Sequence, residues 1–580
     1  MNKHIFSSVL SGLATLGILA SCGEDYLRLE PATSISAGEA IATTQAARMA
    51  TRSLARAMYT QYYNMAYPRQ CSGEATLNAI INDALGPDDA SYFHMRQLNI
   101  NWYPWRSMAN PISSFCEGAW TYCYNFVGQA NTIIDNIGNA EGDERERQQI
   151  EAIARTYRAH GYIKALQWFA PRWEDSDDGK KAATVLRKVS GTGPAPLGTL
   201  SEVLDFIYED LETAERLFAA SGLEREASYE PDIYVAYGLH ARAALIRNDW
   251  QTAKEKAHNA RQGRDVMSME EYMEGFITEN DEYMWTNPAN DINTVMYYSP
   301  GAWFACNGQY PTSWGRCLSI NIDLYERLDP ADQRRILYFI PDRAEEVAQI
   351  EGYESVATLT HDDFWDATFI DPAGVSVKNL TTPAAATDDR MLLMAQGFVK
   401  LAVANNPHSS SPAMVNYPYS YRKGTWPNGM NLGASVKMWS DGTYGENAYP
   451  YMRAAEMYLT EAEAAYMTGD MTTAKECLEA VNTKRIPDYK CTASGEKLLE
   501  EIRLCRRIEL WGEGHNFPDF KRWNVSFNKR KFTSGEPTSG NIDATFAFSV
   551  EPSTANGWRL AIPQQEINSN SGIDRTLVNK

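Results

Sequence analysis

The most regular alternation of apolar and polar positions lies in residues 449–523. Over 451–467 the apolar side chains recur every three or four residues, so that they share one face of a helix. A Thr-Gly-Asp turn at 468–470 interrupts the pattern, and a second apolar stripe follows over 471–484. Two such helices joined by a short turn predict an antiparallel hairpin. A third helix is expected over 496–513.

This hairpin pattern occurs twice in the chain. Ala243, Asp249 and Ala253 recur as Ala464, Asp470 and Ala474, at one offset of 221 residues (464 minus 243, 470 minus 249, and 474 minus 253). Small alanines on both sides of each turn allow the two helices to approach closely, as in tetratricopeptide repeats. The sequence therefore predicts a mainly α fold, a tetratricopeptide-like solenoid of helical hairpins with a long irregular insertion between its two repeat copies.

Other segments extend the helical pattern, and one interrupts it. Further helices are expected over 40–63, 113–137, 144–168, 201–220 and 233–262, the last of these containing the earlier copy of the hairpin. Ser201 is the expected N-cap of its helix. Periodicity is weak over 263–445, where short helices at 320–328 and 332–335 and a few short strands are expected in a mostly irregular segment.

The N-terminus has the pattern of a lipoprotein signal. A basic start precedes an apolar run over 5–20, which is too short to span a membrane and suits a signal-peptide core. Small residues and then Cys22 follow, so Cys22 is the expected lipidation site. The expected organisation is a signal peptide (1–21), a lipidated tether (22–39), a helical-hairpin scaffold (40–262 and 446–523), an irregular inserted ligand-binding region (263–445) and a loop-rich C-terminal segment that packs on the scaffold (524–580).

The hairpin region resembles the C-terminal signature of the SusD/RagB family of outer-membrane nutrient-binding lipoproteins. The matching residues are Arg453, Ala455, Glu456, Tyr458, Leu459, Glu461, Ala462, Glu463, Ala464, Arg506, Arg507, Glu509, Leu510, Glu513, Gly514, Asp519, Arg522 and Trp523. His515-Asn516 departs from the signature, because the arginine usual in this vicinity is missing. The charged positions are expected to be structural, with Arg506, Glu509 and Glu513 at a helical spacing where opposite charges pair.

The resemblance implies a binding subunit rather than an enzyme. It implies a lipid-anchored protein on the extracellular side of the outer membrane, which lids a SusC-like TonB-dependent transporter and delivers an oligosaccharide to it. Charge agrees with this, because 54 Lys and Arg against 74 Asp and Glu give a net charge of −20, which repels nucleic acid. We therefore expect no nucleic-acid partner.

Signatures of catalysis and of metal binding are weak. The sequence contains neither His-Glu-x-x-His nor Gly-x-Ser-x-Gly. Residues 175–179 resemble a calcium loop, but a Gly stands where an oxygen ligand is needed, which favours a solvated acidic loop. The nine cysteines include no Cys-x-x-Cys; Cys477 and Cys505 are expected as buried thiols, and a Cys306–Cys317 bridge stays open. No catalytic residue, metal or cofactor is expected.

Aromatic residues are concentrated in two segments that lack helical periodicity. Residues 92–105 hold five aromatics, and 283–316 hold 8 in 34 residues, about twice the 11% average of the chain. Such rings stack on the apolar faces of sugars, while asparagines bind the hydroxyl groups. The candidate ligand-binding residues are Asn101, Trp102, Tyr103, Trp105, Tyr297, Tyr298, Trp303 and Trp314, with Asn307 as a further polar partner. Each single aromatic is equally well explained by burial in the core, so the prediction rests on their clustering in loops.

The sequence favours a cell-surface glycan-binding lipoprotein, and three alternatives stay open. The same architecture could bind peptides, in a closed cavity with few aromatics. A tetratricopeptide scaffold that binds only proteins would bury the aromatic loops. A surface glycosidase would need two carboxylates about 5–9 Å apart in a cleft.

Overall fold

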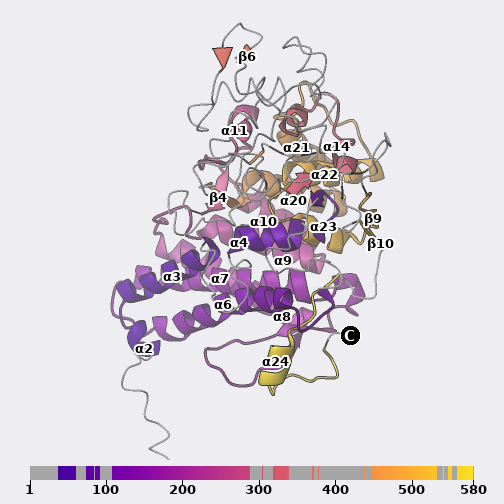
Figure 1. Ribbon diagram of the computed structural model, residues 1–580. Coiled ribbons are helices and arrows are strands. Elements are labelled where there is room, and N and C mark those ends of the chain that lie inside the picture. The colour runs from indigo at the N-terminus through magenta and orange to yellow at the C-terminus, as the bar shows by residue number, and fades with distance from the viewer. Residues whose placement is uncertain are drawn as a thin grey trace, which may run out of the picture.

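The structure is a computed structural model, and most of the residues that it describes are helical. It describes residues 37–59, 73–83, 85–91, 108–287, 304, 318–338, 369–370, 376–377, 433, 435, 437–438, 447–531, 540, 542, 547–551 and 558–578. Figure 1 shows the long helices stacked from α6 to α22, and the C-terminal helix α24 (Gln564–Ser569) begins with a backbone hydrogen bond from Gln564 to the Pro111 carbonyl, just before α6. The predicted mainly α, tetratricopeptide-like fold is confirmed. No helix among these residues combines the length and the apolar character that a bilayer span needs.

The first layers of the stack are α3 (Thr44–Tyr59), α6 (Ser114–Ile137), α7 (Glu144–Phe169) and α8 (Leu200–Ser221). α6 packs on α7, and α7 packs on α8. Ser113 and Asp143 cap α6 and α7 as their hydrogen-bonding side chains predict. The cap of α8 differs from the prediction: it is Thr199, not Ser201, and Thr199 forms a capping box with Glu202.

The two copies of the repeat are neighbours in space. One hairpin comprises α9 (Ile233–Arg247) and α10 (Trp250–Ala260), and the other α20 (Ala454–Met467) and α21 (Met471–Asn482). α10 packs directly on α20, so the solenoid continues across the insertion as if it were uninterrupted. Asp249 and Asp470 cap the second helix of each hairpin through the backbone N–H of Thr252 and Thr473, which explains why both copies carry Asp there.

At two places where the sequence predicts the start of a helix, the structure has a β-strand. Residues 451–453 belong to β8 (Pro450–Arg453), which pairs antiparallel with β4 (Tyr283–Thr286). The pairing gives the chain an extended backbone before α20 begins, and tertiary contact here overrides helical periodicity. Leu318–Ile320 forms β5, which pairs with β1 (Asp89–Ser91), and the helix expected over 320–328 shrinks to α14 (Ile322–Tyr325).

Shorter elements complete the described fold. The helical ones are α2 (Ala37–Ala40), α4 (Glu74–Leu77), the π-helical turn η3 (Asn78–Asp83), η5 (Trp173–Asp175), α11 (Met269–Met273), η6 (Gln333–Leu337), α22 (Glu496–Glu509) and α23 (Asn516–Trp523). The strand pairs are β2 (Ala182–Val185) with β3 (Leu197–Thr199), β6 (Phe369–Ile370) with β7 (Ser376–Val377), and β9 (Phe527–Asn528) with β10 (Ser549–Val550). The expected thiols Cys477 and Cys505 are buried and free, which confirms that prediction.

A glycine marks the closest approach of α6 and α7. A Cβ atom on Gly161 would lie 2.8 Å from the backbone oxygen of Cys123 and 3.1 Å from Cβ of Phe126. We expect Gly161→Ala to lower the free energy of unfolding by about 1–3 kcal/mol, because the helices must move apart. Gly128→Ala is the matched control: Gly128 is exposed on α6 with nothing within 4 Å of the added atom, and alanine there should stabilise by up to about 1 kcal/mol. Urea unfolding measures both, and equal effects would contradict the close approach.

Candidate functional site

The residues that sequence analysis proposed for ligand binding are not among those the structure describes. Asn101, Trp102, Tyr103 and Trp105 lie outside the described residues, as do Tyr297, Tyr298, Trp303, Trp314 and Asn307. The same holds for Cys22, Cys306 and Cys317. All these assignments therefore remain predictions.

The strand that precedes the first aromatic segment pairs with the strand that follows the second one. Ser91, which precedes the segment 92–107, is the Cα partner of Leu318, which follows the segment 305–317. Because β1 and β5 are antiparallel, both segments join the same end of one two-stranded ribbon. Residues more than two hundred positions apart in the sequence are thus attached to the scaffold side by side.

Part of the aromatic density has a structural explanation. Of the eight aromatics in 283–316, the described ones are Tyr283, Trp285 and Phe304, and all three are buried. Trp285 donates a hydrogen bond from its indole nitrogen to the Tyr229 carbonyl at 3.0 Å, and Phe304 packs edge-to-face on Trp511. None of these three was a candidate binding residue, but their burial shows that part of the aromatic density of 283–316 belongs to the core.

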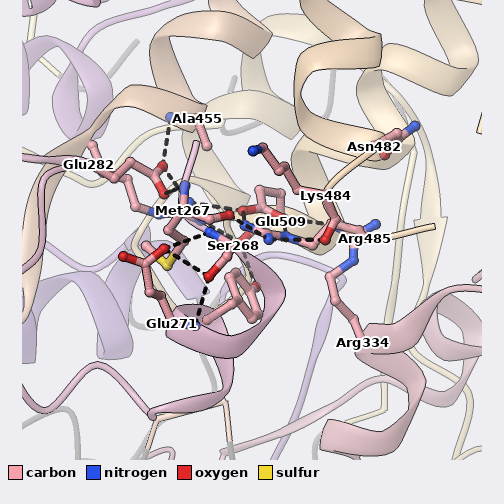
Figure 2. Close-up of polar contacts among 12 residues, drawn as sticks. Met267, Ser268, Glu271, Glu282, Arg334, Ala455, Asn482, Lys484, Arg485 and Glu509 are labelled. Carbon is pink, nitrogen blue, oxygen red and sulfur yellow. Dashed lines mark hydrogen bonds and ion pairs between the residues drawn. The ribbon is translucent and has the colours of Figure 1, made fainter. Parts of the chain in front are cut away.

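The signature helix α22 ends in a buried ionic network. Glu509, at 0% exposure, accepts hydrogen bonds from Arg453, Arg485 and Arg334 at 2.8–3.0 Å. Figure 2 shows Arg485 and Arg334 approaching Glu509 from separate segments, with Arg485 also donating to the Met267 carbonyl at 2.9 Å. Arg453 in turn binds Glu282 and Glu513.

The network connects distant parts of the chain to the signature. Glu282 accepts from the backbone N–H of Ala455 at 2.8 Å, which anchors the start of α20 (Figure 2). Lys437 donates to Glu513 at 2.7 Å and to the carbonyls of Glu509 and Trp511. Glu282, Arg334 and Lys437 all come from the inserted region, so this network fastens the insertion to the solenoid at three points.

These contacts correct one detail of the sequence analysis. Arg506, Glu509 and Glu513 share a helical spacing, but their described partners are elsewhere. Arg506 binds Asp519 at 2.6 Å, whereas Glu509 and Glu513 bind Arg453. α22 ends at Glu509, so Glu513 lies on the following turn rather than on the helix. Sequence reasoning identified the acids but missed Arg334 and Lys437, because nothing local links them to the signature.

The electrostatics of the network exclude acid catalysis by Glu509. Burial alone would raise its pKa, but Arg485, Arg453 and Arg334 hold the pKa of Glu509 well below its ordinary value. A carboxylate that stays ionised cannot donate a proton near neutral pH. The expectation that these signature charges are structural therefore fits the geometry.

The described residues contain no cluster suited to a metal ion. No group of three or more His, Cys, Asp or Glu side chains among them has the arrangement of a metal site. In the loop that resembles a calcium site, the Arg172 guanidinium donates two hydrogen bonds, of 2.8 and 3.0 Å, to the Asp175 carboxylate. Asp177 and Asp178 are exposed to solvent.

Comparison with known proteins identifies the class and the family. The stack of hairpins, with a long insertion fastened to its signature helix, defines a tetratricopeptide-like helical scaffold protein. The SusD family model matches residues 271–578, which is more than half of the chain, and the chain belongs to the SusD family. A second family model, described as starch-binding associating with outer membrane, matches residues 44–245. A search of curated protein sequences gives no match.

Several solved structures share the fold. A SusD-like carbohydrate binding protein from Bacteroides vulgatus ATCC 8482 is 18% identical, with a TM-score of 0.65 over 93% of this chain and 98% of its own. A putative sugar binding protein from the same organism is 17% identical, with a TM-score of 0.63 over 92% and 98%. A SusD superfamily protein from Bacteroides thetaiotaomicron VPI-5482 is 18% identical, with a TM-score of 0.60 over 92% and 99%. At these identities the likeness establishes the fold.

Proposed function

We propose that this protein is a cell-surface glycan-binding lipoprotein that captures oligosaccharides and delivers them to a SusC-like TonB-dependent transporter. Family membership supports a binding role at the outer membrane, and the structural relatives include a SusD-like carbohydrate binding protein and a putative sugar binding protein. Cys22 anchors the protein by its lipid, and no catalytic residue takes part. The protein faces the extracellular side.

The proposal rests on one observation, the pairing of Ser91 in β1 with Leu318 in β5. A sugar-binding platform needs several aromatic rings and hydrogen-bonding groups close together, on rigid attachment points. The candidate residues come from two segments that are distant in sequence, and β1 and β5 attach both to one end of one ribbon. Asn101, Trp102, Tyr103 and Trp105 belong to the first segment, and Tyr297, Tyr298, Trp303 and Trp314 precede β5 in the second.

Calorimetric titration of residues 23–580 against a panel of polysaccharides and peptides tests the proposal. We expect one glycan class to bind, and Trp102→Ala and Trp303→Ala each to raise Kd about tenfold or more, since one stacked ring contributes about 1–3 kcal/mol. Trp250→Ala is the control, because Trp250 is half-buried on the scaffold helix α10. Its Kd should match that of the unmodified protein.

Two outcomes would contradict the proposal. Binding of peptides but not of glycans by the folded protein would assign it peptide cargo. Glycan binding that survives both tryptophan substitutions would place the site elsewhere in the chain.

A further inference from the structure

Two buried aspartates lie next to residues 510–514, the turn between α22 and α23, which is called the signature turn. Asp83 is the last residue of η3 and Asp89 the first residue of β1, and each is 1% exposed. Both oxygens of Asp83 accept from the backbone N–H of Gly514 at 3.2 Å, and Asp89 accepts from the side-chain amide of Asn516 at 3.2 Å. The two carboxyls therefore connect the 73–91 segment to the start of α23.

Neither carboxyl has a cation at ion-pair distance within the described part of the chain. The adjacent Asp88 differs from both, because it forms a bidentate ion pair with Arg507. Asn516 belongs to the pair of residues where the signature arginine is missing, and its amide is neutral. One oxygen of Asp89 and the amide oxygen of Asn516 are buried without a hydrogen-bond partner.

The surroundings leave this pair short of positive charge. Lys437 faces both aspartates, but it donates its hydrogen bonds to Glu513 and to two carbonyls. Lys529 faces both from the segment after α23. Asp88 and Glu513 add further negative charge, and the phenols Tyr449 and Tyr338 also face the pair. Two buried carboxylates without ion-pair partners cannot both ionise without a large free-energy cost.

We infer that the Asp83 and Asp89 carboxyls together retain at least one proton in the folded protein at neutral pH, and that they form a pH-sensitive joint between the 73–91 segment and the signature turn. The hydrogen of the protonated carboxyl supplies the donor that the unpartnered oxygens of Asp89 and Asn516 lack. The inference holds for any cargo, so it stands apart from the proposed function.

The direction of the titration follows from burial. Burial raises the pKa of Asp89 to about 7 and raises the pKa of Asp83 well above its ordinary value, with the repulsion of Asp89 adding to the shift at Asp83. A carboxyl whose pKa is raised on folding binds more protons in the folded state than in the unfolded state. Its contribution to stability is therefore present at acidic pH and is lost as the pH rises through about 7.

The joint formed by Asp83 and Asp89 lies next to the proposed binding region along the chain. β1 begins at Asp89 and ends at Ser91, where the segment 92–107 starts. Deprotonation would place a second negative charge beneath this strand, and so would weaken the attachment of β1 to the signature turn as the medium becomes alkaline.

Unfolding of the full mature chain at pH 5 and pH 8 tests the inference. Asp89→Asn and Asp83→Asn mimic the protonated carboxyl, so each should favour the folded state more at pH 8 than at pH 5. The change that each substitution makes in the ratio of folded to unfolded protein should be about tenfold or more larger at pH 8 than at pH 5. The comparison uses the difference between variant and unmodified protein, so that the pH dependence from other groups, such as buried His160 and part-buried His515, whose pKa values burial lowers, cancels. Asp205→Asn is the control, because Asp205 is exposed on α8 and forms its ion pair with Arg247, so its substitution should change stability equally at both pH values.

An infrared measurement detects the proton itself. At pH 6 we expect the carbonyl stretch of a protonated carboxyl in the unmodified protein, and its loss in Asp83→Asn combined with Asp89→Asn. Absence of this band from the unmodified protein at pH 6 would overturn the inference, and this outcome does not depend on whether a variant folds. A loss of stability in Asp83→Asn and Asp89→Asn that is the same at pH 5 and pH 8 would also overturn it.

Discussion

Replacing Glu509 with glutamine is expected to lower the free energy of unfolding by about 3–5 kcal/mol. The substitution keeps the size of the side chain and removes the charge that faces Arg334, Arg453 and Arg485. These three guanidinium groups are no more than 1% exposed, so water cannot replace the missing carboxylate. Removing one partner of a buried ion pair leaves an uncompensated buried charge, which is the costly case. Urea unfolding of both proteins measures the difference.

The control for Glu509 is Glu500→Gln on the same helix. Glu500 is exposed, and substitutions at such positions usually change stability by less than about 0.5 kcal/mol. If the Glu509 variant were as stable as the Glu500 variant, the network would contribute nothing to the attachment of the insertion. A loss of stability confined to Glu509→Gln supports the three-point attachment.

Acidification is expected to destabilise the protein through Glu463. This fully buried carboxylate accepts from Arg503 and Arg522 and from the Trp523 indole nitrogen. Burial alone would raise its pKa, but Arg522, Arg503 and Arg506 lower it from 4.5 to about 2. A carboxyl whose pKa is lowered on folding contributes stability above its unfolded pKa and loses it as the pH falls. This shift corresponds to about 3 kcal/mol, which is lost between about pH 5 and pH 2.

Urea unfolding between pH 6 and pH 3 measures this dependence. The slope of stability against pH should be smaller in Glu463→Gln, because glutamine does not titrate, and the variant should be less stable than the unmodified protein at pH 6. Glu476→Gln, at an exposed position on α21, should keep the full slope. An unchanged slope in the Glu463 variant would show that other carboxyls govern acid unfolding.

The helical scaffold was predictable because its determinants are local. Spacing of apolar residues, the Asp caps and the Thr-Gly-Asp turn are all properties of short segments, and the boundaries of α6, α7 and α21 agree with prediction to within about two residues. The errors occur where distant segments pair. Residues 451–453 have helical spacing, but pairing with β4 makes them a strand, and no local signal announces a partner that lies in the inserted region.

The candidate site was predictable only in part, for a related reason. The aromatic density of 283–316 is real, but composition does not distinguish a ring that binds ligand from one that fills the core. Trp285 and Phe304 are core residues, whereas Trp303 and Trp314 lie outside the described residues and remain predictions. The Asp83–Asp89 pair could not be found from sequence, because its unusual character depends on which cations fail to reach it.

The pairing of β4 with β8 has a consequence for how the chain can change over evolution. Beyond the strands, Asn287 and Tyr449 are bonded to each other, so the two ends of the intervening segment are held together by the scaffold itself. Closing a chain segment between fixed ends costs little more when it lengthens, about 0.6 kcal/mol for each doubling. Insertions between 288 and 446 are therefore inexpensive for the solenoid wherever they leave β5, Arg334 and Lys437 in contact with the scaffold, so the chain between these fixed points is free to lengthen on an unchanged frame.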